Sequence, residues 1–313
     1  MPGAPCFITP EFSRCARDLR PSHITMKFRQ PHYFRSAFLC VLTPATVLLP
    51  LDQVRANSAT IGKPGTFYLT PSYTYQSFDE FYAGDQLVDT PPNGEEINRQ
   101  SFSLYFEYVM TEDWALDLSL GYFRTESGEG GPFNEGNQDG LADTGLGIRY
   151  ALMRQAEKGM DLAARLGFTI PGDYETGQLS APGDDAFGAN LKLLAGYSFG
   201  STRIEGLLGY GVNEGAVPET WIVGAKIIQE LGAGFSLDVG YRYFDSSGNL
   251  DIGGPGFTPA RLPEVSEKGN IFEIGAAFGD TGGRYYRLFY SQLFDGENVG
   301  REQTLGASVT FSF

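Results

Sequence analysis

The sequence predicts an all-β protein, a transmembrane antiparallel up-and-down β-barrel of about twelve strands, with ten and fourteen as the alternative counts. Three observations lead to this fold class. From Thr66 onward, segments of about ten residues alternate apolar with small or polar side chains, and turns or loops separate them. The chain ends on such a segment, residues 305–313, whose last residue is Phe313. Near its start it carries an apolar stretch typical of a secretory signal.

Two segments precede the predicted barrel. Residues 26–56 begin with Met26 and basic residues, continue through an apolar run at 36–51 and end on the small-residue pattern of a cleavage site. We expect cleavage after Ala56, with Ala59 as the second choice. Residues 1–25 resemble neither a signal nor a domain, so we interpret them as a non-native extension with translation starting at Met26. Residues 57–313 then form a single barrel domain.

The composition of the mature chain excludes several functions. All three cysteines and both histidines lie before residue 57. Seven of the 23 Lys and Arg and three of the 38 Asp and Glu also lie there, which leaves a mature net charge of −19. A chain without His or Cys has no histidine proton relay and no thiolate or imidazole metal site. We therefore expect no enzyme activity, no cofactor, no metal and no nucleic-acid partner.

The predicted strands begin near residues 66, 98, 114, 141, 160, 187, 202, 219, 235, 269, 284 and 301. Short links at 111–113, 154–159, 200–201, 230–234 and 280–283 alternate with longer ones at 79–97, 126–140, 171–186 and 245–268. Short turns face the periplasm and long loops the exterior in bacterial barrels, so this alternation orients the chain. The outer links at 213–218 and 295–300 are exceptions, because they are short.

Three hairpins test the strand register. Centring them on Glu112, Leu231 and Gly282 places apolar residues opposite each other on one face. The first pairs Tyr108 with Leu116, the second Ile227 with Phe235, and the third Phe278 with Tyr286. Aromatic residues near strand ends would form the girdles at the two membrane interfaces: Trp114, Tyr122, Trp221, Tyr241 and Phe313.

The opposite face carries charges that we expect to line the pore. Glu107 falls opposite Asp117, and Arg149 opposite Arg165, all about three residues above their turns. Two acids beside two guanidiniums indicate an ion-pair cluster, which either stiffens the wall or forms a constriction that acts on solutes. Eight more charged residues point inward by the same phase: Lys192, Arg203, Glu205, Lys226, Asp238, Arg242, Glu273 and Arg287. Lys226 lies diagonal to Asp238.

Residues 140–150 begin with a Gly-x-x-Asp turn that leads into a Gly-rich strand, and Gly-Tyr pairs recur at 121, 196, 209 and 240. These motifs resemble outer-membrane transporters of the meta-pathway phenol-degradation family. The resemblance implies an outer-membrane channel for hydrophobic or aromatic solutes. The last strand likewise resembles the closing strand of bacterial barrels, whose assembly machinery reads a terminal Phe; Phe313 is thus the expected assembly signal.

The expected location is the bacterial outer membrane, with lipid, lipopolysaccharide, the barrel-assembly machinery and a small-molecule solute as partners. The main hypothesis is a channel for passive passage of small molecules. The alternative is a non-conducting barrel with a structural or adhesion role. The approximately nine residues before Thr66 look too short for a substantial plug.

Overall fold

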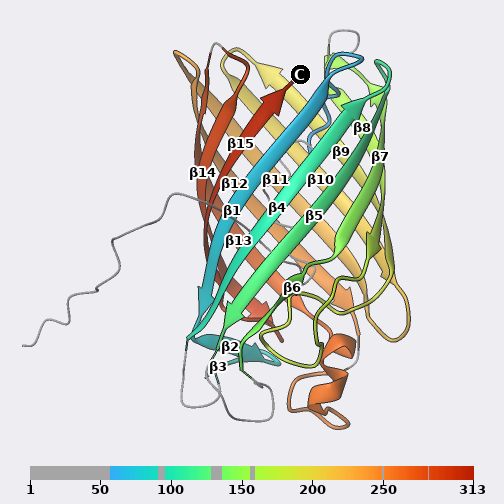
Figure 1. The fold of residues 1–313 in the computed structure, drawn as a ribbon, viewed down its shortest axis with the longest axis vertical. Helices are drawn as coiled ribbons and strands as arrows, with labels where there is room; N and C mark the ends of the chain where they lie inside the picture. The colour runs from blue at the N-terminus through green and yellow to red at the C-terminus, as the bar shows by residue number, and fades with distance from the viewer. Residues whose placement is uncertain (1–56, 91–95, 128–135, 156–158, 249, 281) are drawn as a thin grey trace, which may run out of the picture. The chain divides into compact units, whose positions relative to one another are not determined.

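The computed structural model describes residues 57–313 except for 91–95, 128–135, 156–158, 249 and 281. The predicted extension at 1–25 and the predicted signal at 26–56 lie outside the described residues. In this part of the chain no helix is long and apolar enough to cross a membrane. The described residues form one closed antiparallel barrel with loops at both ends (Figure 1).

The barrel has twelve strands, which confirms the predicted count. Each strand pairs with its neighbours in the chain, and β1 closes the ring by pairing with both β4 and β15. β6 and β7 pair successively with β5 and together make one interrupted strand. The wall consists of β1 Phe67–Phe78, β4 Ile97–Val109, β5 Trp114–Glu126, β6 Gln138–Leu141, β7 Thr144–Met153, β8 Asp161–Ile170, β9 Gly188–Phe199, β10 Thr202–Asn213, β11 Glu219–Gly232, β12 Phe235–Ser247, β13 Lys268–Gly279, β14 Tyr285–Glu297 and β15 Gln303–Ser312.

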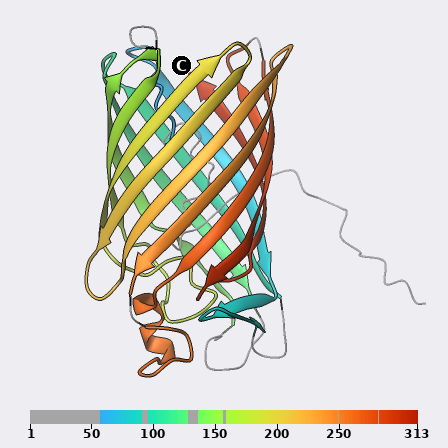
Figure 2. The ribbon, with the colours of Figure 1, turned by 180° about the vertical axis from the view of Figure 1, so that it is seen from behind.

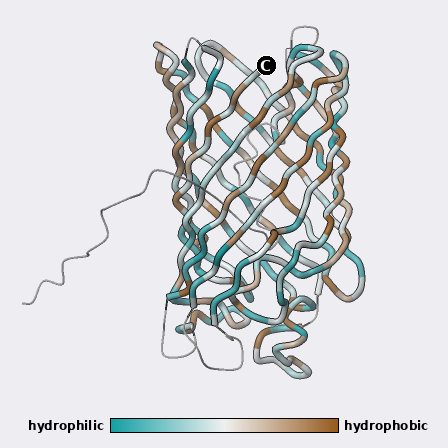
Figure 3. Tube along the Cα trace, in the orientation of Figure 1, coloured by the Kyte–Doolittle hydropathy of each residue, from teal (hydrophilic) through white to brown (hydrophobic). Residues whose placement is uncertain are grey.

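The side chains divide between the two faces of the wall with period two, as strand geometry requires. In β12 the apolar Phe235, Leu237 and Val239 are exposed, whereas the intervening Ser236 and Asp238 are buried. Hydrophobic and hydrophilic residues accordingly follow one another along the strands (Figure 3). A soluble barrel would bury its apolar face, so the apolar exterior and charged interior indicate a membrane barrel.

The short turns gather at one end of the barrel, where the first strand begins and the last strand ends (Figures 1 and 2). Phe67 and Phe313 exchange two backbone hydrogen bonds, which join these strands at the rim. This end is the periplasmic one by the rule for bacterial barrels. The other end carries a small hairpin of β2 Glu80–Ala83 and β3 Gln86–Asp89, the 3-10 helix η1 Pro259–Glu264, and the long loops.

The predicted register is right for two hairpins and wrong for the third. Tyr108 pairs with Leu116 and Phe278 with Tyr286, as expected. Ile227, however, pairs with Val239 and not with Phe235. β11 runs on to Gly232 through a β-bulge, and the turn lies at Ala233 and Gly234, whose φ angles are 52° and 81°. The shift is by an even number of residues, so the same face stays outside.

The aromatic girdle follows the strand ends with one correction. At the periplasmic end, the rings of Trp114 and Tyr150 lie 4.5 Å apart, and at the outer end those of Tyr210 and Trp221 lie 4.6 Å apart. Tyr241 lies in the middle of β12, and the different register places it opposite Ala225. It is therefore not part of a girdle.

Candidate functional site: the barrel lumen

Near the periplasmic end, four buried charges from β4, β5, β7 and β8 form two ion pairs inside the lumen. The predicted cross-strand pairings of Glu107 with Asp117 and of Arg149 with Arg165 are confirmed. Arg149 Nη2 lies 3.0 Å from Glu107 Oε2, with the two side chains 2% and 0% exposed. Arg165 contacts both oxygens of Asp117, with Nε 3.0 Å from Oδ2. Each acid of the repulsive pair is thus compensated by a guanidinium from the adjacent hairpin.

A second cluster of four charges crosses the opposite part of the wall, on β11 to β14. Lys226 Nζ lies 3.0 Å from Glu273 Oε1 and 3.5 Å from Asp238 Oδ1, so the expected diagonal pair is present. Arg287 Nη2 lies 2.7 Å from an oxygen of each of the same two acids. Two cations and two carboxylates therefore balance within one buried network.

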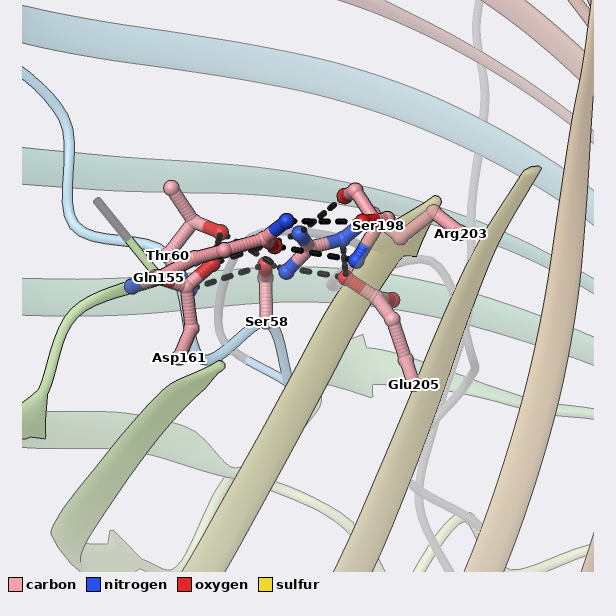
Figure 4. Close-up of polar contacts among 7 residues, drawn as sticks. All are labelled: Ser58, Thr60, Gln155, Asp161, Ser198, Arg203 and Glu205. Atoms are coloured by element: carbon pink, nitrogen blue, oxygen red, sulfur yellow. Dashed lines mark hydrogen bonds and ion pairs between the residues drawn. The ribbon is translucent and has the colours of Figure 1, made fainter. Parts of the chain in front are cut away.

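The residues before β1 enter the lumen at the periplasmic end, contrary to what their short length suggested. Figure 4 shows Ser58 and Thr60 beside Asp161, Arg203 and Glu205 of the wall. Ser58 Oγ donates to Glu205 Oε1 at 3.1 Å, and Thr60 Oγ1 donates to Asp161 Oδ2 at 2.9 Å. Arg203 donates to Thr60 Oγ1 at 2.7 Å. Hydrogen bonds with charged side chains thus hold a short plug against β8 and β10.

Two further contacts extend this attachment to the neighbouring strands β7 and β9. Arg149 Nη1 donates to the carbonyl oxygen of Ser58 at 3.0 Å, and Lys192 Nζ donates to Asn57 Oδ1 at 3.1 Å. Ala59 is buried in an apolar cluster with Ala163 and Leu194. We call residues 57–62 the N-terminal segment. Because the N-terminal segment follows one side of the wall, it closes only part of the lumen.

At the outer end, the loop between β8 and β9 folds into the lumen. Its residues 178 and 180–183 are buried, and we call residues 178–183 the inner loop. Arg99 Nη2 donates to the carbonyl of Ala181 at 2.7 Å, and Thr125 donates to that of Ser180 at 3.0 Å. Arg99 lies on β4, and its hydrogen bond to Ala181 joins residues 82 positions apart in the chain.

Carboxyl groups collect around this inner loop. Burial raises the pKa of Asp184 to about 7, and the carboxyl of Asp143 adds to the rise. Burial also raises the pKa of Glu267 well above its ordinary value, and the charges of Asp184 and Glu302 contribute. The outer mouth is therefore a place where carboxyl groups can hold protons at neutral pH.

Two of the cavities inside the lumen border the N-terminal segment or lie below the inner loop. One of about 300 Å³ lies at the periplasmic end, between the N-terminal segment and the hydroxyl-bearing faces of β1, β14 and β15. The other, of about 140 Å³, lies below the inner loop and is lined by β5 and β7 to β11. Among the described residues, no three His, Cys, Asp or Glu side chains are grouped as a metal site.

All twelve charges predicted to point inward lie on the inner face. Ten of them are buried and Arg203 and Glu205 are partly buried. Arg242 and Glu302 interact electrostatically toward the outer end. The sequence prediction missed Asp161 and Arg99, although each lies in phase with a predicted residue, Arg165 and Glu107. Asp184 and Glu302 lie outside the strands, where a period-two argument gives no direction.

The comparisons with known proteins agree with this architecture. A profile of the family described as "Putative MetA-pathway of phenol degradation" matches residues 83–282, which is more than half of the chain. The crystal structure of an outer membrane channel from Pseudomonas putida F1 is similar, with TM-score 0.65 and 16% identity over 82% of this chain and 98% of that one. No curated protein sequence matches the chain.

Two other solved structures are more distant. The translocator domain of the autotransporter NalP from Neisseria meningitidis gives a TM-score of 0.47 at 13% identity, covering 80% of this chain and 90% of that one. The NanC porin gives 0.46 at 8% identity, covering 78% and 98%. The fold is that of a bacterial outer-membrane barrel, and its apolar exterior fits the lipid environment of that membrane.

Proposed function

The chain belongs to the family described as putative MetA-pathway of phenol degradation, and from this premise we propose that it is an outer-membrane channel for small molecules. Passage is passive and follows the lumen from the outer mouth to the periplasm. The solutes are small hydrophobic or aromatic compounds. No catalytic role is proposed, because the buried charges are occupied with one another and with the N-terminal segment.

The observation that carries this proposal is the presence of two cavities in the lumen, one lined partly by Ser58, Thr60 and Gly62 of the N-terminal segment and the other lined by β5 and β7 to β11. A barrel that serves only as a scaffold can fill its interior with packed side chains. Here, side-chain hydrogen bonds from Ser58 and Thr60 hold the N-terminal segment against the wall beside the periplasmic cavity. Each such bond to a charged partner contributes about 1.5–3 kcal/mol, so the position of the segment depends on a small number of polar contacts that substitution can remove.

The charge arrangement also suits a channel for neutral or weakly charged solutes. The two clusters around Arg149 and Arg287 combine cations with carboxylates at hydrogen-bonding distance. Paired charges present a polar wall without a strong preference for either sign of ion. We therefore expect weak ion selectivity and a small unitary conductance.

Single-channel recording in planar bilayers tests the proposal. The purified protein is expected to give discrete current steps, and a Ser58→Ala, Thr60→Ala double variant is expected to conduct more, by about twofold, since the segment loses contacts with Glu205 and Asp161. Ser247→Ala, at an exposed hydroxyl on the outer rim, is the matched control. A wild-type protein without current steps and without solute uptake into liposomes would contradict the channel function.

The second candidate is a non-conducting barrel with a structural or adhesion role. It is favoured by the occupation of both ends of the lumen, by the N-terminal segment at one end and the inner loop at the other. Under this reading the double variant is as silent as the wild type. The recordings therefore separate the two functions directly.

A further inference from the structure

Lys192 differs in its partner from four other buried cations of the lumen. Its side chain is almost fully buried, with a relative exposure of 2% for the residue. Arg149, Arg165, Lys226 and Arg287 each contact a carboxylate. Among the described residues Lys192 forms no ion pair, and its hydrogen bond goes to the neutral side chain of Asn57. A buried ammonium with only an amide oxygen as partner is incompletely compensated.

Lys192 lines the cavity of about 140 Å³ below the inner loop. Because β9 runs from the outer to the periplasmic end, Lys192 is the residue of β9 that lies deepest in the cavity. Small and apolar residues form much of the neighbouring wall: Gly145, Ala186, Ala189, Gly209, Gly211 and Ile222. A cavity of about 150 Å³ holds one benzene molecule, so this one takes a body of about one ring.

The two ends of the cavity carry different ionisable groups. Lys192 at the deep end interacts electrostatically with Arg165, Arg242 and Asp117, so cations outnumber acids there. Asp143 and Asp184 line the end near the outer mouth. Cleavage after Ala56 would add the α-ammonium of Asn57 to the deep end. An anionic group in the cavity is thus directed to Lys192 and away from the acids.

We propose that this cavity binds a small monocarboxylate with a body of about one aromatic ring, whose carboxylate replaces Asn57 Oδ1 on Lys192 Nζ. This rests on the proposed channel function and names the class of solute. An ammonium binds a carboxylate more strongly than a neutral amide oxygen, and the carboxylate in turn favours the charged form of the lysine. Displacing Asn57 also removes one attachment of the N-terminal segment, on the side toward the periplasm.

Isothermal titration calorimetry on the detergent-purified protein tests the site, with benzoate and its neutral counterpart benzamide as probes. Benzoate is expected to bind, and benzamide to bind at least about tenfold more weakly. Lys192→Met is expected to weaken benzoate binding by about tenfold or more and to leave benzamide unchanged. Lys63→Met, which removes an exposed lysine near the same rim, is the matched control and is expected to bind benzoate as the wild type does.

A second variant leaves the wall intact. Asn57→Asp places a fixed carboxylate where Asn57 contacts Lys192, and is expected to block benzoate as Lys192→Met does. Equal binding of the two probes, unchanged benzoate binding in Asn57→Asp, or no binding of benzoate would overturn the proposal. Single-channel recording on the same preparations keeps the two proposals apart. Current steps without benzoate binding would overturn this site alone, and benzoate binding without current steps would overturn the channel function alone.

Discussion

Buried charges in the lumen are stabilised by residues from separate hairpins. Glu107 forms an ion pair with Arg149 and accepts a hydrogen bond from the hydroxyl of Tyr105 at 3.0 Å. Taking such groups out of water costs several kcal/mol per ion, and the contacts offset that cost only while every partner is present. Single substitutions should therefore be more harmful than the removal of a whole pair.

We expect Arg149→Met to lower the free energy of unfolding by about 3 kcal/mol, because it leaves the buried Glu107 carboxylate without its guanidinium. Adding Glu107→Gln should restore much of that loss, since the amide carries no charge. Urea-induced unfolding from lipid vesicles measures both variants and the corresponding Glu107→Gln single change. Strictly additive losses would mean that the two residues do not interact. In a conducting channel, Arg149→Met should also shift ion preference toward cations.

Asp184 makes the outer mouth sensitive to pH. Its pKa rises from 3.8 in the unfolded chain to about 7 in the closed mouth. Between these pH values the form with Asp184 buried binds more protons than the unfolded chain. Acid therefore stabilises this form, which loses stability as the pH rises through about 7. We expect amide exchange in the inner loop, corrected for intrinsic rate, to be about tenfold faster at pH 8 than at pH 5.5.

Asp184→Asn should remove most of this pH dependence, because the amide does not titrate. Asp185→Asn is the matched control: Asp185 is exposed, and Asn tolerates its φ of 50°. Residual dependence would then come from Asp143 and Glu267, whose pKa values burial also raises. An unchanged pH profile in Asp184→Asn would rule out this carboxyl as the cause.

At the scale of elements, the turn between β11 and β12 shows how two residues set a register. Ala233 and Gly234 have positive φ, as both central residues of a type I′ turn do. A Cβ on residue 234 would overlap the carbonyl oxygen of Gly279, so only glycine fits there. Ala233, in contrast, has a side chain in a conformation that costs about 1–2 kcal/mol for L-residues.

Ala233→Asn is expected to stabilise the barrel by up to about 1 kcal/mol, because Asn tolerates the left-handed conformation and Asn-Gly is the preferred type I′ pair. Gly234→Ala should destabilise it by more than that. Both are measured by urea-induced unfolding. A destabilised Ala233→Asn variant would contradict the assigned turn and, with it, the observed pairing of Ile227 with Val239.

The closing strand allows its assembly role to be separated from its structural one. The Phe313 side chain is exposed, whereas its backbone exchanges two hydrogen bonds with Phe67. Phe313→Gln keeps those bonds, so we expect a loss of about 1 kcal/mol or less in the folded barrel but a several-fold lower amount in the outer membrane. Deleting Phe313 should lower that amount further. Equal surface levels of wild type and Phe313→Gln would refute an assembly signal in the ring.

The start of the mature chain matters for the whole molecule, because the N-terminal segment lies inside the lumen along β7 to β10. Ser58 and Thr60 contact Glu205 and Asp161 of the wall. We expect intact-mass spectrometry of the purified protein to find a chain that starts near Asn57, after translation from Met26. A membrane-inserted product that retains residues 1–25 would contradict this processing.

Local patterns in the sequence determined the fold class, the twelve strands, the outward face and two hairpin registers. Period-two alternation and tight turns act over a few residues, so no distant contact is needed to interpret them. They also brought Glu107, Asp117, Arg149 and Arg165 together, because neighbouring hairpins of equal depth align their charges. Their function as pore-lining residues stays a prediction.

Only the tertiary structure decided what fills the lumen. The attachment of Ser58 to Glu205 spans 147 residues, and that of Arg99 to Ala181 spans 82. Side chains of irregular segments have no fixed period, so their direction depends on which wall groups they meet after the barrel has closed. The bulge before Ala233 was likewise not predicted, because more than one turn position between β11 and β12 keeps the same face outside. Lys192 has its neutral partner, Asn57, only because the N-terminal segment enters the barrel.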